Sequence, residues 1–455
     1  MSAPLDPEAP ADGAAALEQL IDQSAATGAA SNGTAPEPDL DPNGEAILGQ
    51  KQRGWFLPVF VIAWFGISLS GGTIGGASVP RALAVMDNAH KDSNLAIVAA
   101  IGGVVVMIIT PLFGRLSDRT RSRFGIRRPW LLWGTLLSMV GIVVLAFSTS
   151  LPMVIIGWCI GQIGFGAVAM AQHAMLADQI PKRIRARIAA AVSVSAGIAT
   201  IAGTQLVALT ANGAQWLWFL VPGVIGTVLS LLLVFAFTDI VRTDHAIEPL
   251  DVKAILSSYW LNPRRYRDFA FAWACRLLFT ISMIAMSLYL LYFIIDHLGV
   301  PLKQASGVQA TTIVWNFAGL IVSTILFGWL SDKFRRRKLI VWVSCIVAAA
   351  GLLLAILAPS EQMFFVAALI IGVGNGAYSS VDVAMMTEVL PDFRNAGKDL
   401  GVVALSYELP QIIVPVMAVP ILAIGGGNNY GALWIAAIIA AVLGAIAVLP
   451  IRSVR

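Results

Sequence analysis

The sequence is poor in charge. Asp, Glu, Lys and Arg make up 12% of its 455 residues, against about 25% in soluble domains, and 58% of the residues are hydrophobic. The apolar residues gather into runs of about twenty, the length that crosses a bilayer as a helix. Such runs also exclude a porin-like barrel, whose strands alternate apolar and polar residues. The composition therefore predicts an all-α membrane protein.

Cysteine and histidine are also scarce. Cys159, Cys275 and Cys345 lie singly inside apolar runs, a pattern that favours neither disulfides nor a metal cluster. The four histidines form no metal-spaced cluster with them, and no set of Ser, His and Asp shares one membrane depth. We expect no metal, no cofactor and no enzymatic activity.

Basic residues are absent from the first fifty positions. Nine acids occur there: Asp6, Glu8, Asp12, Glu18, Asp22, Glu37, Asp39, Asp41 and Glu45. Because this stretch is also rich in Ala, Pro and Gly, we predict a disordered acidic tail at 1–50, and it lacks the features of a signal peptide. The remaining chain is basic, but its Lys and Arg lie in loops between apolar runs, which indicates membrane topology and not nucleic-acid binding.

The apolar runs predict twelve transmembrane helices. They cover residues 55–79, 94–114, 129–147, 152–179, 187–209, 215–238, 268–295, 305–330, 339–358, 361–390, 398–424 and 430–450. A polar stretch separates six runs from six, and it is too short to be a domain. We expect a six-helix bundle at 51–238, a cytoplasmic linker at 239–267 and a second bundle at 268–455.

The distribution of Lys and Arg predicts the orientation in the cell membrane. Of the 30, 26 lie near the termini and in alternate loops that include the central linker. The opposite loops hold only Arg81, Lys91 and Lys303, and Arg276 lies inside the seventh span. Because cytoplasmic loops carry the excess of Lys and Arg, both termini are expected in the cytoplasm.

The two halves of the chain resemble each other. The segment LFGRLSDR at 112–119 recurs as LFGWLSDK at 326–333, and AMLADQIP at 174–181 recurs as AMMTEVLP at 384–391. The two offsets, 214 and 210, are nearly equal and the topological positions match, which indicates a duplicated six-helix unit. Two halves with the same orientation favour a ligand site at the midplane between them.

At these residues the chain resembles the major facilitator superfamily of transporters, from about residue 51 to the C-terminus. The segment GRLSDRTRSRFGIRRP at 114–129 is similar to the family's motif between helices 2 and 3. It has the longer form found in plant sucrose/proton symporters and in glycoside-pentoside-hexuronide symporters. The resemblance implies a secondary transporter that works by alternating access.

The resemblance also implies a gate at the cytoplasmic ends of the helices. Its residues are Asp118, Arg119, Arg127, Arg128, Asp178, Asp332, Lys333 and Glu388. An acid at a helix end accepts hydrogen bonds from the start of a facing helix, and the Arg side chains pair with acids on neighbouring helices. The alternative is a static role in folding and topology.

Four ionisable residues lie at a similar depth, about 10–15 Å from the cytoplasmic ends of their spans: His173, Arg276, Asp382 and Glu408. Charges facing hydrocarbon are costly, so these residues should face a cavity or a partner. In the fold that the chain resembles, spans 1, 4, 7 and 10 line the cavity. We therefore expect His173, Arg276 and Asp382 to face it.

Arg276 needs an acidic partner, with Asp382 as the first candidate and Glu408 as the second. The acid left over is a candidate proton carrier. We favour Glu408, because Pro410 removes a backbone donor and loosens the adjacent helical turn. A permanent structural pair is the alternative, and His173 is either a proton relay or a structural hydrogen-bonding group.

Uncharged polar and aromatic residues within the spans suit a sugar, whose hydroxyls bind amides and whose ring faces bind aromatic rings. The candidates are Trp64, Gln172, Gln205, Gln309, Trp315, Asn316, Asn375, Tyr378, Tyr407 and Gln411. Hydrogen bonds between helices are the alternative role for several of them.

The leading hypothesis is proton-coupled uptake of a sugar or glycoside across the lipid bilayer. The second span has no carboxylate, so the paired acids of sodium-coupled melibiose-type permeases are missing. Residues 188–209 also lack the Gly-Pro-Gly-Gly type of motif found in many drug/proton antiporters. Proton-driven export of a small metabolite or drug is the alternative, and a transport-fold receptor is the remote one.

Overall fold

The computed structural model describes residues 54–239, 265–334, 336–389, 396–425 and 427–451. All of these belong to one compact unit, Gln50–Arg455. The predicted acidic tail and most of the predicted linker lie outside the described residues.

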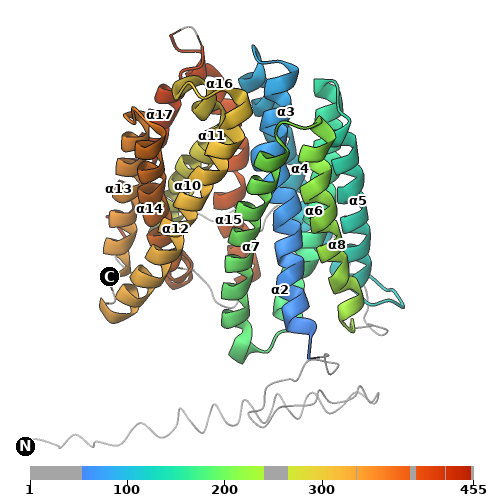
Figure 1. Cartoon of the computed structure of the whole chain (residues 1–455). Coiled ribbons are helices and arrows are strands. Elements are labelled where there is room, and N and C mark those ends of the chain that lie inside the picture. The colour runs from blue at the N-terminus through green and yellow to red at the C-terminus, as the bar shows by residue number, and fades with distance from the viewer. Residues whose placement is uncertain (1–53, 240–264, 335, 390–395, 426, 452–455) are drawn as a thin grey trace, which may run out of the picture. The chain divides into compact units, whose positions relative to one another are not determined.

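The described residues contain twelve helices that are long and apolar enough to span a membrane, which confirms the predicted all-α class. The first half comprises α2 (Phe56–Ile67), η1 (Ser68–Gly72), η2 (Ile74–Ser78), α3 (Val79–Met86), α4 (Lys91–Asp118), α5 (Arg128–Ala146), α6 (Leu151–Asp178), α7 (Lys182–Thr210) and α8 (Gln215–Ala236). The second half comprises α10 (Arg267–Leu288), α11 (Leu290–Tyr292), η3 (Phe293–His297), α12 (Leu302–Phe334), α13 (Arg337–Ile356), α14 (Glu361–Glu388), α15 (Ala396–Glu408), α16 (Pro410–Leu422) and α17 (Tyr430–Val448). Figure 1 shows their arrangement.

Several helices extend beyond the apolar runs. Arg81 lies in α3, Lys91 begins α4 and Lys303 lies in α12, whereas the sequence placed all three in loops. A hydropathy pattern marks only the apolar middle of a helix, and its polar ends continue wherever they find partners. Arg81 and Lys91 are both buried, so these ends are packed against other parts of the protein.

The first span is interrupted by two π-helical segments, η1 and η2. The segment SGGTIGGAS, residues 70–78, covers most of this region, so four glycines occur within six residues. Glycine disfavours regular α-helix, and π-helical turns are often found at functional sites. The widened stretch lies in the middle of the span Phe56–Met86, where it lines the cavity described below.

Each half packs mainly within itself. In the first half α2 packs on α8 and α7, and α5 packs on α6 and α8; in the second, α14 packs on α12 and α13, and α17 on α10 and α13. Two seams join the halves, α4 against α16 and α7 against α12. Glycine permits the close approach of the helices at both seams. A Cβ atom on Gly197 of α7 would lie 2.1 Å from the Phe317 ring of α12, and a Cβ atom on Gly103 of α4 would lie 2.9 Å from the Ile412 side chain of α16.

Candidate functional site

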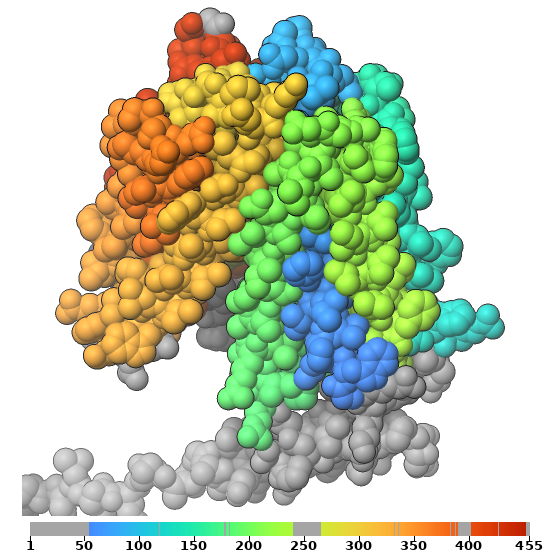
Figure 2. Space-filling model, viewed as in Figure 1, coloured from blue at the N-terminus to red at the C-terminus, as the bar shows by residue number. Residues whose placement is uncertain are grey.

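Two adjoining cavities lie between the halves. One has a volume of about 670 Å³ and the other about 760 Å³. Both are lined by Gly71, Gly72, Gln162, Thr200, Tyr407 and Gln411, so they form parts of one space between α6 and α7 on one side and α15 and α16 on the other. In Figure 2 a hollow separates α7 from α12 in the lower half of the view. A space of this size accommodates a small molecule.

Half of the predicted substrate-binding residues line this space: Trp64, Gln309, Asn316, Tyr407 and Gln411. Two of them also join helices, because Gln309 Nε2 donates to Gly76 O at 2.9 Å and Asn316 Nδ2 donates to Ala368 O at 3.1 Å. Their remaining polar atoms are carbonyl oxygens, which can accept hydrogen bonds from hydroxyl groups.

The other predicted residues do not line either cavity: Gln172, Gln205, Trp315, Asn375 and Tyr378. Trp315 is 42% exposed, although its neighbour Asn316 lines the cavity, because successive residues of an α-helix point about 100° apart. Tyr378 is buried inside the second half and stacks on Phe279, with 3.9 Å between ring centroids. These five positions therefore differ from the expectation.

The sequence interpretation missed several lining residues. Gln162, Trp158, Thr200, Thr204 and Ser287 all line the 670 Å³ cavity. Gln162 carried the same signal as the selected amides, because it is a lone amide in an apolar run. Thr200 and Thr204 follow the helical i, i+4 spacing that places two hydroxyls on one face of α7.

Two of the four deep ionisable residues line the 760 Å³ cavity. Glu408 does so at the end of α15, and α16 begins at Pro410, so the helix is interrupted where the proline was expected to act. His173 also lines this cavity, and its Nδ1 lies 2.8 Å from Ala169 O. The Trp64 ring meets the imidazole edge to face at a centroid distance of 4.7 Å.

The other two ionisable residues pair with each other. Arg276 Nη1 of α10 lies 3.4 Å from Asp382 Oδ2 of α14. Neither residue lines either of the two cavities, which differs from the expectation that both would face the site. Asp382 is 7% exposed, and α10 and α14 both belong to the second half of the chain. The pair is therefore largely buried within that half.

The Arg-rich loop before α5 is held by Asp239, the third residue after the end of α8. Asp239 Oδ2 accepts from the backbone N–H groups of Arg127 at 2.6 Å and Arg128 at 2.7 Å, and it thereby caps the start of α5. Arg127 Nη1 donates to Ser117 Oγ at 2.6 Å, and the Arg128 guanidinium donates to the Phe237 carbonyl. The side chains of Asp118, Asp178 and Asp332 lie outside the described residues.

In the second half, Glu388 forms an ion pair with Arg337. Arg337 begins α13 as Arg128 begins α5, so it occupies the corresponding position of the repeated unit. Lys333 Nζ lies 4.7 Å from the centroid of the Trp329 ring. These contacts lie within one half. We call the end of the unit that carries these groups the Arg128 end.

The opposite end, which we call the Lys91 end, lies at the top of Figure 1 and joins the halves. Arg81 donates from Nη1 to Leu302 O at 2.9 Å and Ser306 Oγ at 2.8 Å, and from Nη2 to Ala211 O at 2.7 Å. Tyr292 Oη donates to Pro80 O at 2.9 Å. The cavity is therefore closed off at the Lys91 end.

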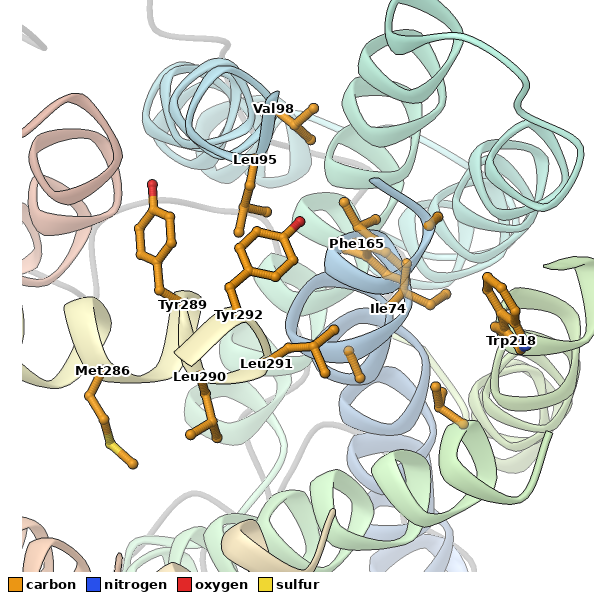
Figure 3. Close-up of a cluster of buried hydrophobic side chains, with 14 of the residues drawn as sticks. Ile74, Leu95, Val98, Phe165, Trp218, Met286, Tyr289, Leu290, Leu291 and Tyr292 are labelled. Carbon is orange, nitrogen blue, oxygen red and sulfur yellow. The ribbon is translucent and has the colours of Figure 1, made fainter. Parts of the chain in front are cut away.

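Tyr292, which takes part in this closure, packs against a second tyrosine, Tyr289, with 6.5 Å between the ring centroids. Figure 3 shows Tyr289, which lies between α10 and α11, and Tyr292 of α11 projecting to the same side, with Leu95 of α4 nearby. Both tyrosines are buried, as is Leu95. The sequence contained a signal for this closure, because Arg81 and Lys91 are two of only three basic residues that the charge bias left on this side.

Comparisons with known proteins agree with this architecture. The family model of the Major Facilitator Superfamily matches residues 54–322 and 277–454. The minor myo-inositol transporter IolF of Bacillus subtilis is 25% identical over 342 residues, which cover 71% of this chain and 73% of that protein. An uncharacterized MFS-type transporter of Mycobacterium tuberculosis is 25% identical over 162 residues, which cover 35% of this chain and only 22% of that relative.

Two solved structures share the fold. A bacterial homolog of the human lysosomal transporter Spinster, in an inward-facing and unoccupied conformation, has a TM-score of 0.63 at 14% identity and covers 89% of this chain and 96% of its own. The nucleoside transporter NupG has a TM-score of 0.68 at 11% identity, and the match covers 87% of this chain and 99% of the NupG chain.

Proposed function

Because the chain belongs to the Major Facilitator Superfamily and is therefore a membrane transporter, we propose that it takes up a sugar or glycoside together with protons by alternating access. One observation carries the proposal: Glu408 lines the same cavity as His173, Trp64 and Gln411, while Arg276 is paired elsewhere with Asp382. An ionisable acid thus lies beside groups suited to a hydroxylated solute.

The chemistry of the lining supports a neutral, hydroxyl-bearing substrate. Amides from two helices (Gln162 of α6, Gln309 and Asn316 of α12), the hydroxyls of Thr200 and Thr204 and the rings of Trp64 and Trp158 face the cavities. Amides and hydroxyls exchange hydrogen bonds with sugar hydroxyls, and aromatic faces pack against sugar rings. The distant likeness to a myo-inositol transporter agrees with such a substrate.

The position of Glu408 supports proton coupling. The carboxyl lies next to the break between α15 and α16, and it lines the same cavity as the second ionisable residue, His173. A carboxyl that binds a proton in one conformation and releases it in the other links the proton gradient to substrate movement. Pro410 supplies a position at which the helix can bend during the change.

We further propose that the Arg128 end faces the cytoplasm, so that this conformation is the inward-facing one. The excess of Lys and Arg in the loops at that end supports this orientation. The buried contacts of Arg81 and Tyr292 at the opposite end then form the closed outer gate.

The test is transport into proteoliposomes with an imposed pH gradient. Purified protein is reconstituted with an alkaline interior, and uptake of labelled sucrose, glucose, myo-inositol and an aryl glycoside is measured with and without the gradient. Gradient-dependent accumulation of one of these solutes supports the proposal. Uptake that ignores the pH gradient contradicts proton coupling, and accumulation only when the gradient is reversed favours export.

A further inference from the structure

A compact polar network joins the two halves at the Lys91 end. Tyr430 Oη of α17 lies 2.7 Å from Asp92 Oδ1 of α4 and 2.9 Å from Asp296 Oδ2 of η3. Lys91 Nζ of α4 lies 2.9 Å from Asp296 Oδ1 and 2.7 Å from Asp296 Oδ2. Tyr430 and Lys91 are each 1% exposed, so the centre of this network is shielded from water.

The hydrogen atoms in this network can be counted. A tyrosine hydroxyl has one hydrogen to donate, yet Tyr430 Oη lies within hydrogen-bond distance of two carboxyl groups. If both carboxyls were ionised, one of the two short contacts would bring two oxygen atoms together with no hydrogen between them. Both contacts are satisfied only when one carboxyl is protonated and donates to the tyrosine oxygen.

The charges lead to the same result. Two ionised carboxylates and one ammonium group would leave a net negative charge in a largely buried site, which is costly. Lys91 lies within 3 Å of both oxygens of Asp296, so Asp296 is the carboxylate that stays ionised. The proton then belongs to Asp92, which donates to Tyr430, and Tyr430 donates to Asp296.

We propose that Asp92 is a proton-binding site of the outer gate, and that the gate closes when Asp92 takes up a proton. Asp92 and Lys91 belong to the first half, whereas Asp296 and Tyr430 belong to the second. Opening this end separates Asp92 from Tyr430 and exposes the carboxyl to water, where it ionises. This inference rests on the proposed alternating access but not on the coupling role of Glu408, because the proton enters and leaves from the outer side.

The other titratable groups around this site do not supply the missing hydrogen. Tyr292 donates to Pro80 O and has Lys91 Nζ 5.6 Å from its ring centroid, and Tyr289 packs beside Tyr292. The neighbouring histidines, His90 and His297, are exposed. They contact Asp87 at 2.9 Å and Ile356 O at 3.0 Å respectively.

The closed-to-open ratio of the outer gate should therefore rise as the pH falls. A single proton bound only in the closed form changes this ratio by up to about tenfold per pH unit. The distance across the gate is measurable by electron spin resonance between labels on Ala89→Cys and Ala423→Cys, two exposed positions beside the network on opposite halves. Cys159 is replaced by Ala, while Cys275 and Cys345 are buried and do not require replacement.

The measurement uses the full-length protein in nanodiscs, with no substrate and the same pH on both faces. Asp92→Asn places a permanent donor at the site, so the gate should stay closed at all pH values and the pH dependence should be lost. Tyr430→Phe removes the bridging hydroxyl, so the closed population should fall and its midpoint should move to lower pH. If Asp92→Asn does not insert into the membrane, Tyr430→Phe carries the test alone.

Three matched controls isolate the site. Asp87→Asn changes a partly exposed acid in the same loop, where hydrogen bonds from His90 lower the pKa of the Asp87 carboxyl, and it should keep the pH dependence. His90→Gln and His297→Gln should also keep it. A wild-type distance that does not change with pH, a normal pH response in Asp92→Asn or Tyr430→Phe, or loss of the response in a histidine variant would overturn the proposal. Glu408→Gln should keep the gate response, which separates this proposal from proton coupling.

Discussion

Arg276 and Asp382 form an ion pair at 3.4 Å between α10 and α14. The acidic partner of Arg276 is therefore Asp382 and not Glu408. The two acids at similar depth thus have different surroundings. Asp382 is buried beside Arg276, whereas Glu408 lines the cavity between the halves. Under the proposed mechanism, a change of Asp382 should alter the stability of the protein, and a change of Glu408 should alter proton coupling.

Glu408→Gln should abolish accumulation driven by a pH gradient and spare exchange of labelled for unlabelled substrate. Exchange needs no net proton movement, and glutamine resembles the protonated carboxyl in shape. Both modes are measured in the same proteoliposomes, with Glu361→Gln, an exposed acid at the start of α14, as the control. A fully coupled Glu408→Gln, or one that loses both modes equally, would mean that another residue carries the proton.

Asp382→Asn should destabilise the protein, because it leaves Arg276 largely buried without its acidic partner. Breaking a buried ion pair costs about 3–5 kcal/mol, and this should appear as a lower thermal unfolding temperature in detergent. The double variant Arg276→Gln, Asp382→Asn should recover part of the loss. Equal stability of Asp382→Asn and the unmodified protein would argue against a structural pair.

Asp239→Ala should weaken the start of α5, because the Asp239 carboxylate accepts the backbone N–H groups of Arg127 and Arg128. Loss of a helix N-terminal cap costs about 0.5–2 kcal/mol. The change is measured by thermal unfolding, and Asp87→Ala, which removes an acid outside any described helix, is the control. An unchanged unfolding temperature for Asp239→Ala would show that the cap contributes nothing measurable.

Gln162→Ala should weaken substrate binding, whereas Gln205→Ala should not. Both changes remove the same amide from a long helix, but only Gln162 lines the cavities. The loss of one hydrogen bond of about 1 kcal/mol raises KM about fivefold. The measurement is uptake as a function of concentration for the solute found in the substrate screen. A larger effect from Gln205→Ala would place the substrate elsewhere.

Lys333→Cys should react with a membrane-impermeant thiol reagent only after the cells are permeabilised, and Ala89→Cys should react in intact cells. The two positions lie at opposite ends of the membrane-spanning unit, and both are exposed. The positive-inside bias predicts this pattern. Reaction of Lys333→Cys in intact cells would reverse the proposed orientation.

The sequence by itself determined the fold class and the number of spans. A transmembrane helix is recognised from the length and apolarity of one continuous segment, so no knowledge of its neighbours is needed. The repeated segments at 112–119 and 326–333 similarly indicated two related halves. The family followed from the same motif, and the family model matches nearly the whole described chain.

Only the tertiary structure decided which way each side chain points and which charges meet. Trp315 and Asn316 are adjacent in the sequence, but the rotation of α12 about its axis, set by its packing on α14 and α7, places only Asn316 in the cavity. Glu388 meets Arg337 within one half, and Asp92 meets Tyr430 across the two halves, through contacts between residues far apart in the chain. Depth in a membrane can be counted along one helix, but the partner of a charge depends on the packing of several helices together.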